Sequence, residues 1–560
     1  MPQSINENSR ARGATLVCLV LSALALGIRF VGLSQPYHQD EYKWAFIVDP
    51  AHNAGEAAIP HPPLAEWLYH LTGAHFGYDH LRLLPFFASF IFGILLFYIV
   101  RRVYGLRAAS LALFFWAIDL YAVLASLQID IDGVLLPIFT LCMLGGYELW
   151  KTEKFSARVI ALFAIGIVGG AFTKLSFVLA PVAIALDLLW RYRHLILQRP
   201  RILREILVGF CALAVLALIG FFALKNVPIF SYAEKFMHVG GRDYFELMFL
   251  TAKAVIYLSP FLILGALLGL KRFHRFSLWF WFLAASILFY AVAFDFTHTT
   301  LDRYWMVLIL PCVVITAGVL GEQIENLRVG TNEIALGAVC AALVALASAI
   351  VFSAPKVVIP LQPKDAFLHA FFSGHWSFLI PLSGGSGPLG FYLPLDGIAF
   401  LGLLSLAGAI ILLCAQSRRA QIFAMCLVVC AGIVYNGFGV AEYLGGFFYG
   451  SAPAVYAQLI TRVNGDPSIP QVITYNDIGA YELTLSGKYF KRFYTDPMFA
   501  QTNVGKFSSY DGYYMVLDMP AINTDSAYWK YFQQCKNVYQ TNDKQISGYI
   551  FDCRGVRFTS

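Results

Sequence analysis

Residues 83–100 read LLPFFASFIFGILLFYIV, eighteen consecutive residues without a charged side chain. A helix of this length rises far enough to cross the roughly 30 Å hydrocarbon layer of a bilayer. The run is apolar on all sides, which is typical of a helix surrounded by lipid or by other helices. Arg101 and Arg102 follow directly and mark its end at the membrane surface. The stretch therefore predicts a membrane-spanning helix.

Similar apolar segments recur along most of the chain. Six are clear, at 206–224, 276–294, 304–321, 334–355, 397–417 and 422–440. Six are weaker or shorter, at 13–28, 108–128, 133–147, 159–173, 175–186 and 254–270. Together they predict thirteen spans, or twelve if the two runs that flank Lys174 form one bent segment.

The composition agrees with a membrane protein. Of the 560 residues, 13% are charged and 59% are hydrophobic, whereas a soluble fold carries about 25% charged residues. So few charges would not cover several water-exposed domains, and the sequence predicts an all-α polytopic membrane protein in contact with membrane lipid. No basic stripe of useful length lies outside the short loops, so a nucleic-acid partner is not expected.

Basic residues predict the orientation of the spans. They cluster in the loops on the side of the N-terminus, for example at 101–107 and 191–204, and are sparser in the longer loops opposite. Because loops rich in Lys and Arg stay in the cytoplasm, this side is the expected inner face. The first apolar run has no small-residue cleavage site after it, so we expect an anchor and not a cleaved signal peptide.

An odd number of spans places residues 441–560 outside, beyond a transmembrane domain at 1–440. This tail is more polar, with expected buried strands at 472–475 and 513–517 and turns at 464–467 and 476–479. It predicts a small extracytoplasmic α/β domain. Cys535 and Cys553 are its two cysteines and would pair in an oxidising compartment, although two unrelated thiols are the alternative. The other eight cysteines lie in apolar spans, as packing residues do.

Polar residues gather at the expected outer ends of separate spans. They are Asp40 and Glu41, Asp130 and Asp132, Lys174, and Asp295, His298, Asp302, Arg303 and Tyr304. Carboxylates and isolated cations at one level form a candidate acid/base and anion-binding site. For each residue alone, helix capping, a snorkelling side chain or a structural ion pair is the simpler explanation. Asp119 lies inside a span, and the sequence gives it no mechanistic role.

Six short motifs occur in order along residues 15–320. They are Asp40-Glu41, His61-Pro62-Pro63-Leu64, His80-Leu81-Arg82-Leu83-Leu84-Pro85, Asp132-Gly133-Val134-Leu135-Leu136, Thr173-Lys174 with Pro181, and Arg303-Tyr304 with Pro311. Their order resembles the GT-C superfamily of integral-membrane glycosyltransferases, in particular the branch with protein O-mannosyltransferases and the aminoarabinose transferases of lipid A. Two positions depart from that pattern, with His61 in place of Lys and Leu175 in place of Gly.

The resemblance implies a reaction and a role for each motif. The donor would be a polyprenyl-phosphate-linked sugar, and the acceptor a hydroxyl of a lipid, a glycan or a protein. Asp40 would accept the proton of the acceptor, Glu41 would orient the loop, and Asp132 would hold the acceptor or stabilise positive charge on the sugar. The donor phosphate would bind Lys174 and Arg303, with further hydrogen bonds from His61, His298 and Tyr304.

Cofactor, location and rival functions complete these expectations. No metal-ligand spacing occurs in the sequence, and we expect no required cofactor. A divalent metal at Asp40 and Asp132 stays possible, because related oligosaccharyltransferases use such ions.

The large lumenal insertion of eukaryotic O-mannosyltransferases is missing, which favours a bacterial inner membrane with the site on the periplasmic side. The alternatives are a transporter or flippase of lipid-linked sugars, and a non-catalytic membrane scaffold.

Overall fold

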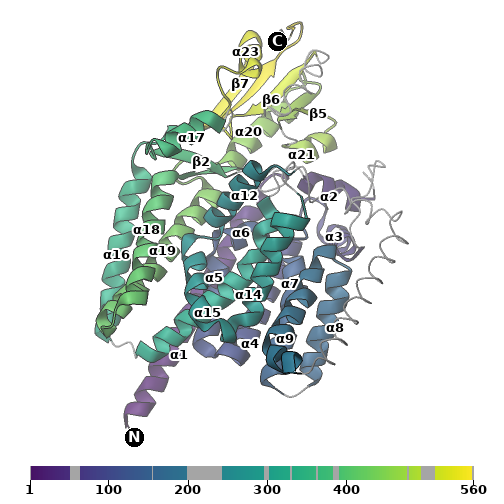
Figure 1. Cartoon of the computed structure of the whole chain (residues 1–560). Coiled ribbons are helices and arrows are strands. Elements are labelled where there is room, and N and C mark those ends of the chain that lie inside the picture. Colours follow the sequence, from purple (N-terminus) through teal and green to yellow (C-terminus); the bar gives the residue numbers. More distant parts are fainter. Residues whose placement is uncertain are drawn as a thin grey trace.

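A computed structural model of the chain consists of a large bundle of helices with a small sheet domain at one end (Figure 1). It describes residues 2–38, 40–50, 63–153, 156–198, 242–295, 302–327, 331–360, 364–382, 390–475, 478–493 and 511–557. The N-terminus lies at the end of the bundle opposite the sheet domain. The predicted fold class, an all-α membrane domain with a small C-terminal α/β domain, is confirmed.

The first half of the bundle consists of long helices connected by several short ones. Its elements are α1 (Pro2–Ile28), η1 (Arg29–Ser34), α2 (Asp40–Val48), α3 (Pro63–Phe76), α4 (Leu83–Tyr104), α5 (Leu106–Ile118), α6 (Leu120–Ser126), α7 (Leu135–Thr152), α8 (Ala157–Ala171), η2 (Leu175–Val178) and α9 (Leu179–Gln198). Helices α2 and α3 lie at the end of the bundle that carries the sheet domain (Figure 1).

The second half completes the bundle and connects it to the sheet domain. Its elements are α12 (Tyr244–Tyr257), α13 (Pro260–Leu268), η3 (Gly269–Arg272), α14 (Phe273–Leu288), η4 (Phe289–Ala293), η5 (Asp302–Leu308), α15 (Ile309–Leu327), α16 (Thr331–Ser353), α17 (Lys364–Phe372), α18 (Leu395–Cys414) and α19 (Arg418–Gly445). A three-stranded sheet, β1 (Val357–Val358), β2 (Phe378–Leu382) and β3 (Phe391–Pro394), lies between α16 and α18.

Eight segments of the described chain are long and apolar enough to cross a membrane, or nine if the bent pair α5 and α6 is one span. The chain is therefore an integral membrane protein. They include segments that contain the predicted runs at 83–100, 304–321 and 422–440, and a segment that overlaps most of the run at 397–417 but ends at Cys414. The predicted run at 206–224 lies outside the described residues. The number of thirteen spans stays a prediction.

The predicted span at 108–128 is broken at Asp119, where α5 and α6 meet at an angle of 67°. A break leaves backbone carbonyls and amides without helical partners. The buried Arg29 guanidinium donates to the carbonyls of Trp116 (2.9 Å) and Ala117 (3.0 Å) at the end of α5. The Asp119 carboxylate accepts from the Ala122 amide (3.1 Å) and caps α6. This gives Asp119 the structural role that the sequence left open.

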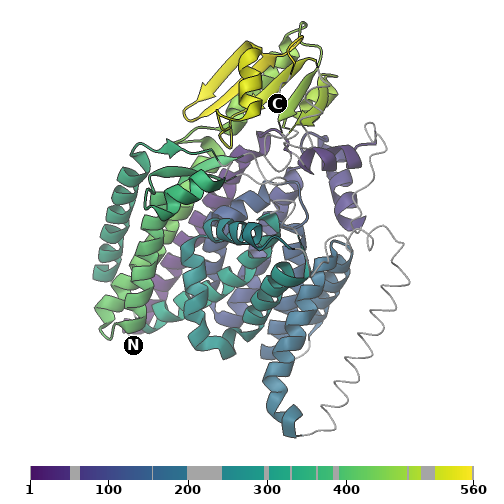
Figure 2. The same ribbon diagram turned by 45° about the horizontal axis from the view of Figure 1, so that its top comes forward.

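The C-terminal domain contains a five-stranded sheet in the order β5-β4-β6-β8-β7. Figure 2 shows this domain at one end of the helix bundle. The elements of the domain are α20 (Ala452–Gly465), β4 (Val472–Tyr475), α21 (Ala480–Leu485), β5 (Tyr489–Phe493), β6 (Tyr513–Leu517), α23 (Ala527–Gln534), β7 (Lys536–Asp543) and β8 (Ile546–Asp552). The two predicted strands are β4 and β6, and both are largely buried. Cys535 and Cys553 form a disulfide, which is the first of the two alternatives.

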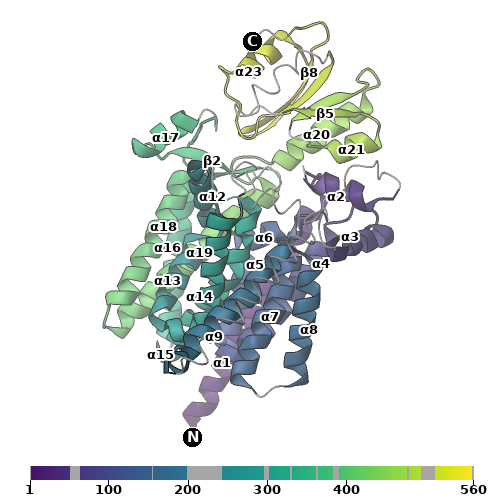
Figure 3. The same ribbon diagram turned by 45° about the vertical axis from the view of Figure 1, so that its right-hand side comes forward.

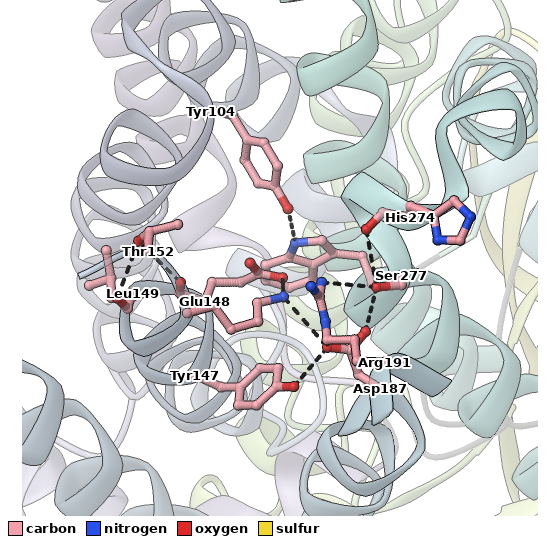
Figure 4. A network of polar contacts seen from close by, with 11 residues as sticks. Tyr104, Tyr147, Glu148, Leu149, Thr152, Asp187, Arg191, His274 and Ser277 are labelled. Atoms are coloured by element: carbon pink, nitrogen blue, oxygen red, sulfur yellow. Dashed lines mark hydrogen bonds and ion pairs between the residues drawn. The ribbon is translucent and has the colours of Figure 1, made fainter. Parts of the chain in front are cut away.

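A network of polar side chains, which we call the inner network, joins α7, α9 and α14 (Figure 4). The buried Asp187 carboxylate accepts from Tyr147 Oη (2.8 Å) and Arg191 Nε (2.7 Å), and from the Ser277 hydroxyl. Lys151 Nζ binds Glu148 at 2.7 Å. Glu148 is thirteen residues past the start of α7, or roughly 20 Å along the helix. The network therefore lies toward the far ends of α7 and α9 from Asp132 and Lys174, which lie in the segments that precede these two helices.

Candidate functional site

The first turn of α2 carries Asp40 and Glu41, and Glu41 is held from several directions. Arg82 contacts both oxygens of the Glu41 carboxylate, with Nη2–Oε2 at 2.6 Å and Nε–Oε1 at 3.0 Å. The same carboxylate accepts from the backbone amides of His38 (3.1 Å) and Ile129 (3.0 Å). Both side chains are buried. A buried bidentate pair with additional hydrogen bonds is rigid, so Glu41 fixes the start of α2.

Asp40 lies next to this fixed residue and faces two cations. Lys43 Nζ is 3.0 Å from Asp40 Oδ1, and Arg303 Nη2 is 3.2 Å from Asp40 Oδ2. The Asp40 side chain is 19% exposed, against 1% for Glu41. Burial raises the pKa of the Asp40 carboxyl, but the positive charges of Arg303 and Lys43 lower it by more, so the net pKa lies below its ordinary value. Asp40 is therefore an ionised carboxylate that a ligand can reach.

The loop between α6 and α7 brings Asp130 to the same arginine. Arg303 Nη1 is 3.5 Å from Asp130 Oδ1. Tyr69 of α3 holds the Asp130 backbone, donating to its carbonyl (2.8 Å) and accepting from its amide (2.9 Å). Asp130 is 4% exposed, and no described residue donates a hydrogen bond to its Oδ2. Burial raises the pKa of the Asp130 carboxyl, and Arg303 compensates only in part. One arginine thus bridges two carboxylates from distant segments.

Asp132 and Lys174 form a second ion pair, with Nζ and Oδ2 2.5 Å apart. Gly133 permits the close approach of this loop to α6, because a Cβ atom there would lie 2.6 Å from the Ala125 carbonyl oxygen. Lys174 lies in extended backbone between α8 and η2. Its ammonium lies 4.5 Å from the ring centre of Tyr304, and the Arg303 guanidinium lies 5.7 Å from the same ring. The Tyr304 ring therefore joins the two groups of charges.

A small apolar pocket opens beside Asp132 and Tyr304. Its other lining residues come from α7, α14, η5 and α15: Leu136, Pro137, Thr140, Phe282, Val307 and Leu310. Charged groups at one end and apolar walls at the other are what a ligand with a charged head and a hydrocarbon tail requires.

The structure brings six of the eight predicted site residues into one region: Asp40, Glu41, Asp132, Lys174, Arg303 and Tyr304. His61 and His298 lie outside the described residues. Lys174 and Arg303 were expected as isolated cations, yet each is paired with carboxylates.

Three further residues of the site received no role from the sequence. Arg82 lies in the motif His80–Pro85 and pairs with Glu41. Lys43 lies one helical turn from Asp40 and pairs with it. Asp130, one of the polar residues near the ends of the spans, pairs with Arg303. The signal for Arg82 was its charge directly before an apolar span, where an unpaired cation is costly.

Within the described part of the chain, no group of three or more His, Cys, Asp or Glu side chains is arranged to hold a metal ion. Asp40 and Asp132, the two residues suggested for a metal, each already bind at least one basic side chain. A divalent cation held by Asp40 and Asp132 would therefore have to displace these basic side chains.

The chain is similar to a known protein family and to several solved structures. No curated protein gives a significant match. ArnT from Cupriavidus metallidurans bound to undecaprenyl phosphate is 17% identical, with a TM-score of 0.49, over 98% of this chain and 100% of that one. The archaeal oligosaccharyltransferase AglB from Archaeoglobus fulgidus, in complex with an inhibitory peptide and a dolichol-phosphate, is 12% identical, with a TM-score of 0.46. The match covers 95% of this chain and 74% of AglB.

The family comparison matches the part of the chain that holds four of the six motifs. Residues 60–221 match the family described as dolichyl-phosphate-mannose-protein mannosyltransferase. This stretch includes Asp130, Asp132 and Lys174 of the site, and the match supports glycosyl transfer as the activity. The chain is thus similar to the integral-membrane glycosyltransferases of the GT-C superfamily, as the order of its motifs predicted.

Proposed function

We propose that this protein transfers a sugar from a polyprenyl-phosphate donor to a hydroxyl acceptor at the outer face of the membrane. The observation that carries the proposal is the arrangement around Tyr304. An accessible carboxylate, Asp40, and two cations, Lys174 and Arg303, share one region with an apolar pocket. Such a region can hold a nucleophile, a phosphate and a lipid chain together.

The acceptor hydroxyl is a weak nucleophile until its proton is removed. Asp40 is ionised and accessible, so its carboxylate accepts this proton while the acceptor oxygen attacks the anomeric carbon. Glu41 does not react, because Arg82 and two backbone amides occupy its oxygens. Its role is to hold α2 so that Asp40 faces the acceptor.

The bond from the anomeric carbon to the phosphate oxygen breaks as the new bond forms, and the electron pair leaves with polyprenyl phosphate. Lys174 and Arg303 neutralise the charge that develops on this leaving group. Asp132, paired with Lys174, stabilises the positive character of the sugar ring. Direct displacement inverts the configuration at the anomeric carbon. His61, His298 and Tyr304 are the further phosphate contacts that the sequence predicts.

The apolar side chains that line the pocket beside Asp132 would contact the first carbons of the polyprenyl chain. This pocket lies directly next to the phosphate-binding cations, where the lipid chain of the donor must leave the site. The matching family is named for dolichyl-phosphate mannose, which supports a donor of this class. Lipid, glycan and protein hydroxyls are all candidate acceptors. The cellular location that we propose is a bacterial inner membrane, with the site in the periplasm.

We further propose that the reaction needs no divalent metal. Asp40 and Asp132 are paired with Lys43, Arg303 and Lys174, and a cation would have to displace these partners. Transfer by purified enzyme is expected to change by less than about twofold after treatment with EDTA. Loss of activity that is restored by Mn²⁺ or Mg²⁺ would show that a metal is required.

The deciding experiment uses purified protein in detergent and, in parallel, in sealed vesicles. Mass spectrometry of the co-purified lipid first identifies the donor class, and transfer is then followed as release of polyprenyl phosphate. We expect a glycosylated acceptor with inverted anomeric configuration. Movement of intact donor across the vesicle membrane without transfer would support the flippase alternative. Neither transfer nor movement by a folded protein, with each donor tested, would support a non-catalytic scaffold.

A further inference from the structure

The C-terminal domain inserts one side chain into the core of the membrane domain beside the proposed site. Tyr481 of α21 is 4% exposed and belongs to the hydrophobic cluster of the helix bundle, whereas the other buried side chains of its helix belong to the clusters of the sheet domain or to none. Figure 3 shows α21 directly above α2, and the two helices are in contact. The sheet domain therefore touches the segment that carries Asp40.

The contacts of Tyr481 lie on both sides of Asp40 in the sequence. Its ring centre is 5.0 Å from that of Tyr37, in the loop before α2, and 5.5 Å from that of Phe46, within α2. Aromatic pairs at these distances are attractive and prefer particular orientations. The ring of Tyr481 thus bridges the loop and the helix between which Asp40 lies.

Tyr37 connects this contact to the rigid part of the site. Its hydroxyl accepts from the Leu81 amide (2.9 Å) and donates to the Tyr78 carbonyl (3.1 Å). The Arg82 guanidinium lies 5.3 Å from the Tyr37 ring centre, and Arg82 holds Glu41. A continuous set of contacts therefore runs from Tyr481 through Tyr37 and Arg82 to Glu41, the residue next to Asp40.

Helix α21 is itself well anchored, so it can transmit a constraint. Gly479 starts the helix with φ +69°, a conformation that other residues rarely adopt, and packs close to Ile460 of α20. Leu483 is fully buried in the core of the sheet domain. The position of Tyr481 is thus set by the fold of the C-terminal domain and not by the loop that it contacts.

We propose that Tyr481 is a positioning residue through which the C-terminal domain holds α2, and with it Asp40, in place for the reaction. This role rests on the proposed glycosyl transfer for its kinetic consequence, but the structural constraint on α2 stands without it. Tyr481 contacts neither the proposed phosphate-binding cations nor the pocket. Its loss therefore affects the chemical step more than the binding of the donor.

The first test measures the constraint itself, independently of activity. Hydrogen exchange by mass spectrometry is recorded for peptides covering α2 in the full-length wild type and in Tyr481→Ala, Tyr481→Leu, Tyr481→Phe and Leu485→Ala. Leu485 lies on the same helix but is 48% exposed, so it is the matched control. We expect exchange in α2 to be at least about tenfold faster in the Ala and Leu variants and unchanged in the Phe variant and the control. Equal exchange in all five proteins would overturn the proposal.

The second test is kinetic and uses the same proteins. For Tyr481→Ala we expect kcat to fall about tenfold while KM for the donor changes less than twofold, with activity retained in Tyr481→Phe. A rise in KM at constant kcat, or an equal loss in Leu485→Ala, would contradict a positioning role. If Tyr481→Ala does not fold, as judged by size-exclusion chromatography, the Leu variant decides. Faster exchange in α2 of an enzyme without any transferase activity would refute the proposed function but leave the constraint in place.

Discussion

The candidate site around Asp40, Asp132, Lys174 and Arg303, called here the outer site, and the inner network both consist of buried or partly buried ion pairs. Only the outer site also has the features of a ligand-binding site. In the inner network, Asp187 is fully buried and accepts hydrogen bonds from Tyr147, Arg191 and Ser277 (Figure 4). In the outer site, Asp130 is almost as buried, and its Oδ2 accepts no hydrogen bond from any residue that the structure describes. Asp40 is partly exposed.

This comparison shows that buried ion pairs alone do not identify a functional site. A carboxylate whose oxygens all accept hydrogen bonds from protein groups has no free acceptor position for a ligand, and its role is to hold the helices together. The outer site combines one buried carboxylate oxygen, Asp130 Oδ2, that accepts no hydrogen bond from the described residues, a partly exposed carboxylate, Asp40, cations against an aromatic ring, and an adjacent apolar pocket. Variants in the two regions should therefore differ in kind, affecting catalysis in one and stability in the other.

The largest effect is expected for Asp40→Asn. This substitution keeps the shape of the side chain but removes the base, so transfer should fall about 10³-fold. Donor binding should be nearly unchanged, because the phosphate contacts remain. The rate is measured with labelled donor in detergent, after size-exclusion chromatography confirms the fold. Transfer within threefold of wild type would end the proposed role of Asp40.

A smaller effect is expected for Lys174→Ala. Removing one counter-charge of the leaving phosphate should lower kcat/KM about 100-fold. The loss should be smaller in Lys174→Arg, which keeps the charge. Because Lys174→Ala also leaves Asp132 without its partner, Lys174→Gln, which can still donate a hydrogen bond but carries no charge, is the control for this effect. If Lys174→Ala lowers thermal stability but not activity, Lys174 belongs with structural residues such as those of the inner network.

For Lys43→Gln we expect the rate of transfer at pH 7 to fall by at most about threefold. The dependence of the rate on pH is more informative than the rate at pH 7. The lowered pKa of Asp40 keeps the carboxylate ionised as the pH falls, so the wild-type rate should be constant from pH 7 to 5. Lys43 is one source of the lowering, and its removal raises the pKa of Asp40. The acidic limb of the profile should then move to higher pH. An unmoved acidic limb would show that another group controls it.

The smallest effect on activity is expected in the inner network. Asp187→Asn removes the acceptor of a buried group and should lower the free energy of unfolding by about 3 kcal/mol. The rate of transfer per folded molecule should stay within twofold of wild type. Thermal unfolding followed by fluorescence, with transfer measured on the folded fraction, separates the two quantities. A large loss of transfer in the folded fraction would mean that the inner network acts on the reaction as well.

The sequence predicted much of the fold because each signal is local. A run such as 83–100 determines its own helix through burial of apolar surface in lipid, and the strands at 472–475 and 513–517 are marked by apolar residues between turns. The break at Asp119 was not predicted, since Arg29, which satisfies the freed carbonyls, is almost ninety residues away. The contact of Tyr481 with Tyr37 and Phe46 was missed for the same reason.

For the site, the sequence by itself determined which residues carry charge at the outer ends of the spans, because a charge near a bilayer is conspicuous whatever its neighbours are. Only the tertiary structure decided how these charges are shared: Arg303 between Asp40 and Asp130, Lys174 with Asp132, and Arg82 with Glu41. Partnership depends on distances of a few ångströms between segments that are tens to hundreds of residues apart. Those distances are set by helix packing, to which the whole bundle contributes.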